Sequence, residues 1–359
     1  MASSLKDIFQ RFSDSFWSET IWLPPNVTWR TYEERAGGIE YAQFNDIYFS
    51  LLTAIVIIAV RFTLERFLLR PIGRKLGIKD NRVYSVPHNR ILEEFFQNSK
   101  KLSRDQLAGL AKRTDLSERA VEKWFIKRKN INKPTTLVRF SETAWRCLFY
   151  TFIFSFGLWA LYDKPWTWDS SHCFINYPHH SVSPEIWWYY NIELGFYLSL
   201  LISQFFDVKR NDFWQMFIHH LVTVLLLCFS WAGNLHRIGT LVLIIHDFAD
   251  IPLEGAKLTR YLKTPRLANV VLTIFIVCWI YSRLGLLPFR VIYYSAYYTL
   301  TMFPMFPAYY IFNCLLAVLQ LLHVIWTWLI LRIAYNAIFV GGVKDLRESD
   351  DEEDPDDSE

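Results

Sequence analysis

The sequence predicts an all-α polytopic membrane protein with about seven transmembrane helices and a small cytosolic insert of three helices. Three observations lead to this prediction. Hydrophobic residues make up 52% and aromatic residues 18% of the 359 residues, more than is usual for a soluble domain. Several apolar runs reach about 20 residues, the length that crosses a bilayer. The net charge of only +3 hides a basic stretch after the first apolar run and an acidic C-terminal tail.

Residues 1–45 are predicted to form a lumenal N-terminal segment. They contain no short basic stretch followed by an apolar run, so we expect no cleaved signal peptide. Asn26 begins the N-glycosylation sequon Asn-Val-Thr, which is used only on the lumenal side. The first span is predicted at 46–69. Arginines and lysines follow it closely, so the positive-inside rule places its C-terminal end in the cytosol.

Residues 70–135 are predicted to form a basic soluble domain. Helical patterns are found at 88–101, 103–114 and 117–130. Ser103 with Gln106 has the pattern of a capping box, and Ser117 suits an N-cap. A small core is expected from apolar side chains, namely Leu102, Leu107, Leu110, Leu116, Val121, Trp124 and Phe125. The basic charge favours contact with anionic lipid headgroups or polyanionic ligands.

The remaining spans are expected within residues 137–340. Their predicted ranges are 142–162, 184–206, 213–231, 238–256, 267–289 and 305–333. Basic residues are concentrated in alternate loops, which is consistent with seven spans and a cytosolic C-terminus.

Residues 341–359 are predicted to be an acidic, disordered cytosolic tail. Ser349 and Ser358 lie among its carboxylates and suit phosphorylation by kinases that prefer acidic sites. The five cysteines of the chain contain no CxxC and predict no disulfide framework, although a Cys173–Cys228 pair is left open.

Two neighbouring spans carry ionisable residues where a lipid-facing helix should have none. His219 and His220 are adjacent in one span, and Asp247, Asp250 and Glu254 share one face of the next. An acidic group at mid-bilayer costs roughly 2.5–3.5 kcal/mol, so these groups imply partners or water. Histidines on one helix and carboxylates on its successor are therefore the candidate chemistry.

Imidazole suits proton transfer because its unperturbed pKa lies near neutrality. The two adjacent histidines are about 100° apart around a regular helix, so one is expected to react while the other orients or packs. Carboxylates can orient an imidazole and stabilise its protonated form. The HxxHH clusters of di-iron membrane enzymes are missing, which argues against a metal site. GxGxxG and P-loop motifs are also missing.

The stretch from Phe213 to Lys257 resembles the Lag motif of ceramide synthases. Its matching positions are His219-His220, Arg237-x-Gly239-Thr240, His246-Asp247-x-x-Asp250 and Leu253-Glu254-x-x-Lys257. The similarity extends over a TLC-type membrane domain at about 137–340, including Ser282-Arg283-Leu284, Phe312-Asn313 and His323.

The third helix of the insert resembles a homeodomain recognition helix, an insert found in animal-type ceramide synthases. Lys127 stands where homeodomains carry the adenine-reading Asn, and a transmembrane span replaces the minor-groove arm. Both departures argue against sequence-specific DNA binding.

The resemblance implies an endoplasmic-reticulum acyltransferase that joins a fatty acyl group from acyl-CoA to a sphingoid base, giving ceramide or dihydroceramide without a further cofactor. It implies six helices around a central cavity, with the first span outside them. The implied catalytic residues are His219, His220, Asp247 and Asp250. Candidate substrate-binding residues are Arg283, Glu254, His246, Asn313 and His323. Candidate CoA contacts at the cytosolic mouth are Lys209, Arg210, Lys257 and Arg260.

Two routes are open for the reaction. A histidine can deprotonate the amine for direct attack, or His219 can carry the acyl group as an acyl-imidazole. The loop 290–304, which contains four tyrosines, is expected to close one end of the cavity and tune acyl length. A non-catalytic membrane protein that binds or senses lipid is the alternative function. The sequence leaves the acyl length and the oligomeric state open, a homodimer or heterodimer included.

Overall fold

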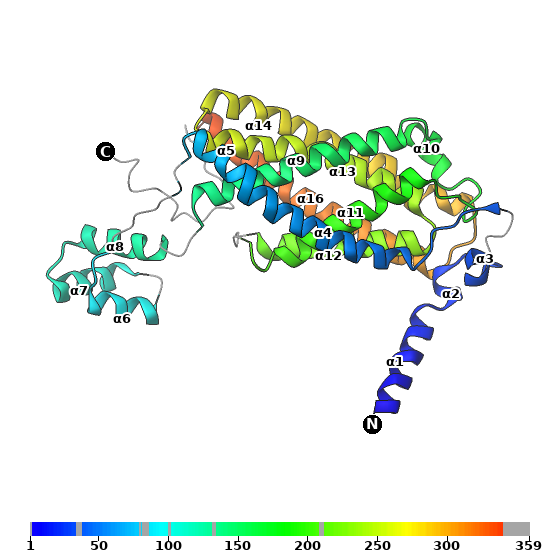
Figure 1. The fold of residues 1–359 in the computed structure, drawn as a ribbon, viewed down its shortest axis with the longest axis horizontal. Helices are drawn as coiled ribbons and strands as arrows, with labels where there is room; N and C mark the ends of the chain where they lie inside the picture. Colours follow the sequence, from blue (N-terminus) through cyan, green and yellow to red (C-terminus); the bar gives the residue numbers. More distant parts are fainter. Residues whose placement is uncertain are drawn as a thin grey trace.

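The computed structural model describes residues 2–33, 38–78, 80, 86–99, 102–130, 134–207 and 212–339, and its regular elements there are all helices. The all-α prediction is therefore confirmed. Long, roughly parallel helices form a bundle, and three short helices lie beside one of its ends (Figure 1). The bundle helices are α4 (Asp46–Leu64), α9 (Thr136–Leu161), α11 (Pro184–Ser203), α12 (Phe213–Ala232), α13 (His236–Tyr261), α14 (Pro265–Trp279) and α16 (Pro307–Phe339).

Shorter elements connect or extend the bundle helices. They are α1 (Ala2–Phe16), α2 (Glu19–Trp22), α3 (Trp29–Glu33), α5 (Arg70–Lys75), α10 (Pro165–Trp168) and α15 (Tyr293–Ala296). Two segments are π-helical, η2 (Glu65–Leu69) and η4 (Ile280–Ile292). Among the elements that lie wholly within the described ranges, η3 (Ser170–Cys173) and η5 (Tyr298–Thr301) are 3-10 helices.

Five of the described helical stretches are long and apolar enough to cross a membrane, namely 46–75, 136–161, 213–232, 265–301 and 307–336. The helices α11 and α13 have a similar length but carry more polar side chains. α13 packs against α9, α14 and η4 in the interior of the bundle, and α11 packs against α4 and α12. The most polar of the long helices therefore lie where protein rather than lipid surrounds them.

The first span, α4, packs closely along α11. Gly195 permits this approach, because a Cβ there would lie 2.9 Å from the Thr53 side chain. Ser50 Oγ donates to Asn191 Oδ1 at 2.6 Å. Arg61 is 6% exposed and donates to Asp207, in the segment that follows α11, at 2.8 Å. The first span is thus joined to the bundle by polar contacts as well as by packing.

The three-helix unit consists of α6 (Arg90–Asn98), α7 (Arg104–Thr114) and α8 (Glu118–Asn130). The capping box of Ser103 and Gln106 is present, and Ser117 Oγ accepts from the Ala120 N–H, as predicted. The buried core comprises Leu92, Leu110, Ala111, Val121, Trp124 and Phe125. The prediction that Leu116 belongs to this core is wrong. Leu116 is 39% exposed, because it follows the left-handed residue Asp115 in the turn after α7.

The loop between α9 and α11 closes the opposite end of the bundle. Asn234, with φ of 54°, belongs to the turn between α12 and α13 and contacts this loop: its Nδ2 donates to the carbonyls of Pro178 (2.7 Å) and His180 (2.9 Å). The His180 ring is buried, and burial lowers the pKa of His180 to about 4. Cys173 is buried in this loop. All five cysteines are free, so the suggested Cys173–Cys228 pair does not form.

Two kinds of predicted modification site differ in where they lie. Asn26 is exposed in the turn between α2 and α3, and its glycosylation stays a prediction. Ser349, Ser358 and the acidic tail lie outside the described residues.

Candidate active site

Three histidines from three helices meet in the interior of the bundle. They are His219 of α12, His246 of α13 and His323 of α16. Their ring centroids lie 6.5 Å apart for His219 and His246, 5.1 Å for His246 and His323, and 6.2 Å for His219 and His323. We call these residues the histidine cluster. The sequence marked all three as candidates, and the structure brings them together.

The ring nitrogens of this cluster leave open positions for a reactant. The Nδ1 of His246 lies 2.6 Å from the carbonyl oxygen of Val242 in its own helix. A carbonyl only accepts, so Nδ1 carries the hydrogen and Nε2 keeps its lone pair. In the described part of the chain, no hydrogen-bond partner reaches this Nε2, nor Nδ1 of His219 or His323. Three buried nitrogens are thus free to receive or give a proton.

His220 points away from this cluster, as expected for neighbours on one helix. Its Nδ1 lies 3.0 Å from Oε1 of Gln204, which follows α11, so the amide oxygen accepts the Nδ1 hydrogen. Its ring lies near that of Tyr197, with centroids 6.5 Å apart. His220 is held by a partner, whereas His219 is not.

Tryptophans form the wall beside the histidine cluster. Trp326 lies edge-on to His219 with centroids 5.3 Å apart, and Trp279 lies edge-on to His323 at 5.7 Å. The Trp279 Nε1 donates to Thr327 Oγ1 at 2.9 Å, which fixes the indole. Buried aromatic rings around the histidines exclude water and hold their orientation.

Arg283 of η4 is the cation nearest to this site. Its guanidinium is 2% exposed and donates to Asp250 Oδ1 at 3.2 Å. It also donates to the carbonyls of Ile245 (3.1 Å) and His246 (2.9 Å) and lies 5.2 Å from the ring centroid of Trp279. The structure therefore pairs Arg283 with Asp250.

Asp247 faces a different neighbour. It is fully buried and accepts a hydrogen bond from the Tyr189 hydroxyl of α11 at 3.2 Å. Gly157 of α9 makes room for this tyrosine, because a Cβ there would lie 2.9 Å from the hydroxyl oxygen. Within the described chain, no hydrogen bond joins His219 or His220 to Asp247 or Asp250. The sequence suggested imidazole–carboxylate pairs. The structure differs, because Tyr189 of α11 bonds Asp247 and Arg283 of η4 bonds Asp250 instead.

A polar cavity of about 160 Å³ lies on one side of the histidine cluster. Its lining includes His219, His220, His323, Asp250, Glu254, Arg146, Lys257 and Arg283. Lys257 donates to Glu254 at 2.6 Å. Arg260 instead lines a neighbouring groove that shares Lys257 with this cavity. Lys209 and Arg210 lie outside the described residues.

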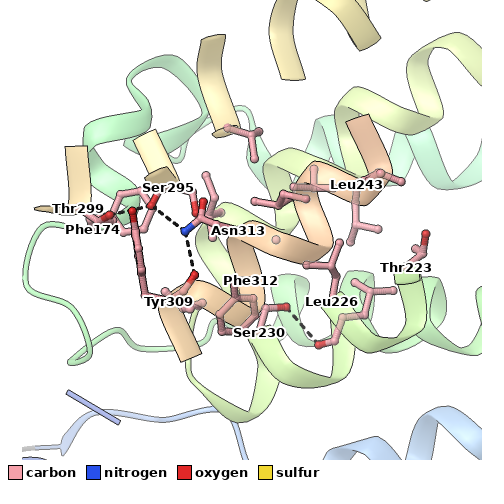
Figure 2. Close-up of a pocket in the computed structure, with 18 of the residues that line it drawn as sticks. Phe174, Thr223, Leu226, Ser230, Leu243, Ser295, Thr299, Tyr309, Phe312 and Asn313 are labelled. Atoms are coloured by element: carbon pink, nitrogen blue, oxygen red, sulfur yellow. Dashed lines mark hydrogen bonds between the residues drawn. The ribbon is translucent and has the colours of Figure 1, made fainter. Parts of the chain in front are cut away.

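A second, apolar cavity of about 70 Å³ is lined by His246 of the histidine cluster. Figure 2 shows this cavity. Its lining includes Leu226, Leu243, His246, Phe303, Phe312, Leu316 and Leu319. His246 lines only this cavity, whereas its two partners in the histidine cluster line the polar one. Asn313 also lines it and donates to the carbonyls of Tyr309 (2.9 Å) and Ser295 (3.3 Å).

The loop 290–304 forms one end of the apolar cavity, through Ser295, Thr299 and Phe303. Its four tyrosines do not line the cavity, and Tyr293 and Tyr297 are more than half exposed. The loop lies at the end of the cavity, as the sequence suggested. Its smaller side chains and a phenylalanine line the cavity instead of its tyrosines.

Several residues of the site escaped the sequence analysis. Glu193 of α11 is fully buried beside Asp247, and Arg146 and Gln204 line the polar cavity. A signal existed for Glu193, since it is a carboxylate within the predicted span 184–206. Nothing in the sequence marks Tyr189, because tyrosines are frequent throughout the chain. Among the described residues, no group of three or more His, Cys, Asp or Glu side chains could hold a metal ion.

Comparisons with known proteins agree with this architecture. The TLC domain family matches residues 139–332, and the homeodomain family matches residues 72–133. Ceramide synthase 5 of Mus musculus is 39% identical over 335 residues, which covers 93% of this chain and 81% of the relative. Ceramide synthase 4 of Homo sapiens is 40% identical over 345 residues, covering 96% and 87%. Ceramide synthase 3 of Homo sapiens is 38% identical over 347 residues, covering 96% and 90%.

Proposed function

The chain belongs to the ceramide synthase family, and on this premise we propose that it transfers a fatty acyl group from acyl-CoA to the amine of a sphingoid base. The product is ceramide or dihydroceramide, and free CoA leaves. The observation that carries the proposal is the position of the histidine cluster between an apolar and a polar cavity.

This arrangement suits an acyl-CoA, which has a hydrocarbon chain, a thioester and a polyanionic head. The apolar cavity receives the acyl chain, and the thioester then lies beside the histidine cluster. The polar cavity takes the uncharged pantetheine arm, whose amide groups can hydrogen-bond to its polar lining. Lys257, which this cavity shares with the neighbouring groove, is placed to meet the CoA phosphates. Burial of the chain supplies binding energy, at about 0.8 kcal/mol for each CH₂ group.

The reaction needs a base because a sphingoid amine is protonated near neutral pH. The ammonium first gives one proton to an imidazole, which passes it to solvent. The neutral nitrogen then attacks the thioester carbonyl and the C–S bond breaks. The second nitrogen proton passes to an imidazole and from there to the leaving thiolate. In the covalent variant, an imidazole nitrogen first displaces the thiolate, and the amine then breaks the acyl–nitrogen bond.

His219 is the proposed reacting imidazole. Its Nδ1 has no partner in the described chain, and its ring faces His246 and His323. His220 is held by Gln204 and is assigned an orienting role at the cavity wall. Asp250 with Arg283, and Asp247 with Tyr189, fix the α13 wall of the site. We further propose an endoplasmic-reticulum membrane location, with the polar cavity open toward the cytosol.

The decisive experiment is an acylation assay with purified full-length protein. Sphinganine and acyl-CoAs of graded length are supplied, and amide formation is followed by mass spectrometry. We expect an amide product from wild type and none from His219→Ala. Absence of amide with every acyl-CoA, from folded wild-type protein, would overturn the proposal and favour a lipid-binding role.

The two chemical routes are separated by withholding the amine. Rapid quenching of enzyme with acyl-CoA alone, followed by intact-mass analysis, should reveal an acyl adduct that is missing in His219→Ala. Turnover without any adduct in wild type would establish direct transfer.

A further inference from the structure

Glu193 lies at the centre of the bundle and has no role in the reaction described above. It belongs to α11, its side chain is fully buried, and both of its carboxyl oxygens lack a donor in the described part of the chain. A carboxylate buried without any donor or cation would be strongly destabilising. Glu193 is therefore not explained as an ionised carboxylate without a partner.

The neighbour of Glu193 is the carboxyl group of Asp247. Glu193 follows Tyr189 by one turn of α11, and Tyr189 donates to Asp247, so the buried Glu193 carboxyl faces that of Asp247 within hydrogen-bonding reach. Oδ1 of Asp247 also lacks a hydrogen-bond partner among the described residues. A carboxylate only accepts hydrogen bonds, so two carboxyl groups can bond to each other only if one carries a proton. The pair therefore holds one proton.

The surroundings decide which of the two carries it. Asp247 accepts from the Tyr189 hydroxyl at 3.2 Å, and the guanidinium of Arg283 bonds the carbonyl of the adjacent His246, so a donor and a cation lie on the Asp247 side of the pair. Glu193 has neither a donor nor a cation partner. The other titratable groups facing the pair are Tyr150 of α9, Tyr197 of α11 and Asp250 of α13. The tyrosines are neutral at physiological pH, and the negative charge of Asp250 opposes a second carboxylate.

We propose that Glu193 is a protonated carboxylic acid that donates a hydrogen bond to Asp247 and holds this aspartate ionised and oriented. Glu193 is thus a positioning residue that acts through Asp247. Its effect on turnover rests on the proposed acyl transfer, whereas the shared proton does not.

The first test reads the proton directly, by infrared spectroscopy of purified full-length protein in H₂O and D₂O. We expect the carbonyl band of a protonated, deuterium-sensitive carboxylic acid to be lost in Glu193→Gln. Glu185→Gln is the matched control on the same helix. Glu185 accepts from Lys164 Nζ at 2.8 Å, so its replacement should remove a carboxylate band instead. Loss of a carboxylate band in Glu193→Gln would overturn the proposal, whether or not the protein is active.

The second test separates donation from simple packing. Glu193→Gln keeps an N–H donor toward Asp247, so its turnover should stay within about threefold of wild type. Glu193→Leu removes the donor at similar volume, and kcat should fall about 10- to 100-fold, as for loss of a hydrogen bond to a charged group. The acid limb of its pH–rate profile should move to higher pH, because Asp247 then ionises less readily.

The comparison of these two variants also guards against misfolding. Equal loss in Glu193→Gln and Glu193→Leu, with unshifted pH profiles, would indicate a structural role only and would overturn the positioning role. An inactive wild type with the expected infrared result would reject the proposed acyl transfer and leave the acid–carboxylate pair standing.

Discussion

The membrane bundle and the three-helix unit of α6–α8 hold their charges in opposite environments. In the bundle, Arg283 is 2% exposed and pairs with Asp250. In the unit, the side chains of the Arg90–Glu94 pair are 86% and 62% exposed. Surface pairs of this kind contribute about 0–1 kcal/mol, whereas removing one member of a buried pair leaves an uncompensated charge. Charges in the bundle therefore mark a function or a fixed partner, and those in the unit mark a solvated surface.

The sharpest test of this contrast is His219→Ala. If the polar groups of the bundle carry out the chemistry, loss of the reacting imidazole should lower amide formation by at least about 10³-fold. The assay is acyl transfer by purified protein. His172→Ala, in the loop between α9 and α11, is the control and should stay near wild type. Retention of a tenth of the activity by His219→Ala would contradict the assignment.

Arg283→Met should give the largest loss of stability. The variant leaves Asp250 buried without its cation, at a cost of about 3–5 kcal/mol. Thermal unfolding in detergent measures the effect. The double variant Arg283→Met with Asp250→Asn should recover part of the loss, because it removes the unpaired charge as well. A single variant as stable as wild type would show that Asp250 has another partner.

The pH dependence of stability should distinguish the two regions. Burial lowers the pKa of His180 to about 4, below the ordinary 6.5, so the folded state favours the neutral ring. This contribution is fully present above pH 6.5 and is lost as the pH falls toward 4, by about 2 kcal/mol at pH 5. Thermal unfolding between pH 7 and 5 should show the loss. His180→Asn, which keeps a donor, should flatten the slope, and an unchanged slope would exclude His180 as its source.

A substitution at the far end of the apolar cavity should change selectivity rather than stability. Thr299→Leu fills space where loop 290–304 meets this cavity. We expect about a tenfold drop in kcat/KM for the longest acyl-CoA that wild type accepts, and little change for shorter ones. Competition assays with mixed chain lengths measure this ratio. Tyr297→Phe, in the same loop but exposed, is the control. A uniform loss at all lengths would place the chain end elsewhere.

The smallest effect is expected in the three-helix unit. Hydrogen bonding from Arg128 lowers the pKa of Glu93, so this contribution is present above its ordinary value of 4.5 and is lost as the pH falls through the lowered value. Glu93→Gln should leave acyl transfer within about twofold of wild type at pH 7, since this partly exposed pair lies in the three-helix unit and not in the bundle. A large loss of activity would show that the unit communicates with the bundle.

Local patterns in the sequence predicted local structure well. The spans around His219 and Asp247 were expected at 213–231 and 238–256, and they form α12 (Phe213–Ala232) and α13 (His236–Tyr261). Hydrophobic runs and cap residues determine such boundaries within a few residues. Ionisable residues within these two spans marked the histidine and aspartate positions, and the resemblance to a known motif then agreed with them.

Contacts between distant segments could not be predicted in this way. The meeting of His323 with His246, and of Tyr189 with Asp247, depends on how helices rotate about their axes when they pack. Leu116 shows the same limit within a short segment, since one left-handed residue turned an apolar side chain into solvent. Which side chains contact each other across helices depends on the packing of the whole bundle, and the pattern of a single sequence does not show it.

The polar contacts between α4 and the α11 region have a practical consequence for protein engineering. Ser50 binds Asn191 in the first half of α11, and Arg61 binds Asp207 beyond its end, so polar contacts fix the helix that carries Glu193 and Tyr189 at two separate points. The first 75 residues are therefore not an exchangeable anchor. A chimera that swaps them between relatives must carry matched residues on both sides of the α4–α11 interface, or the swapped protein will lose rigidity around the candidate active site.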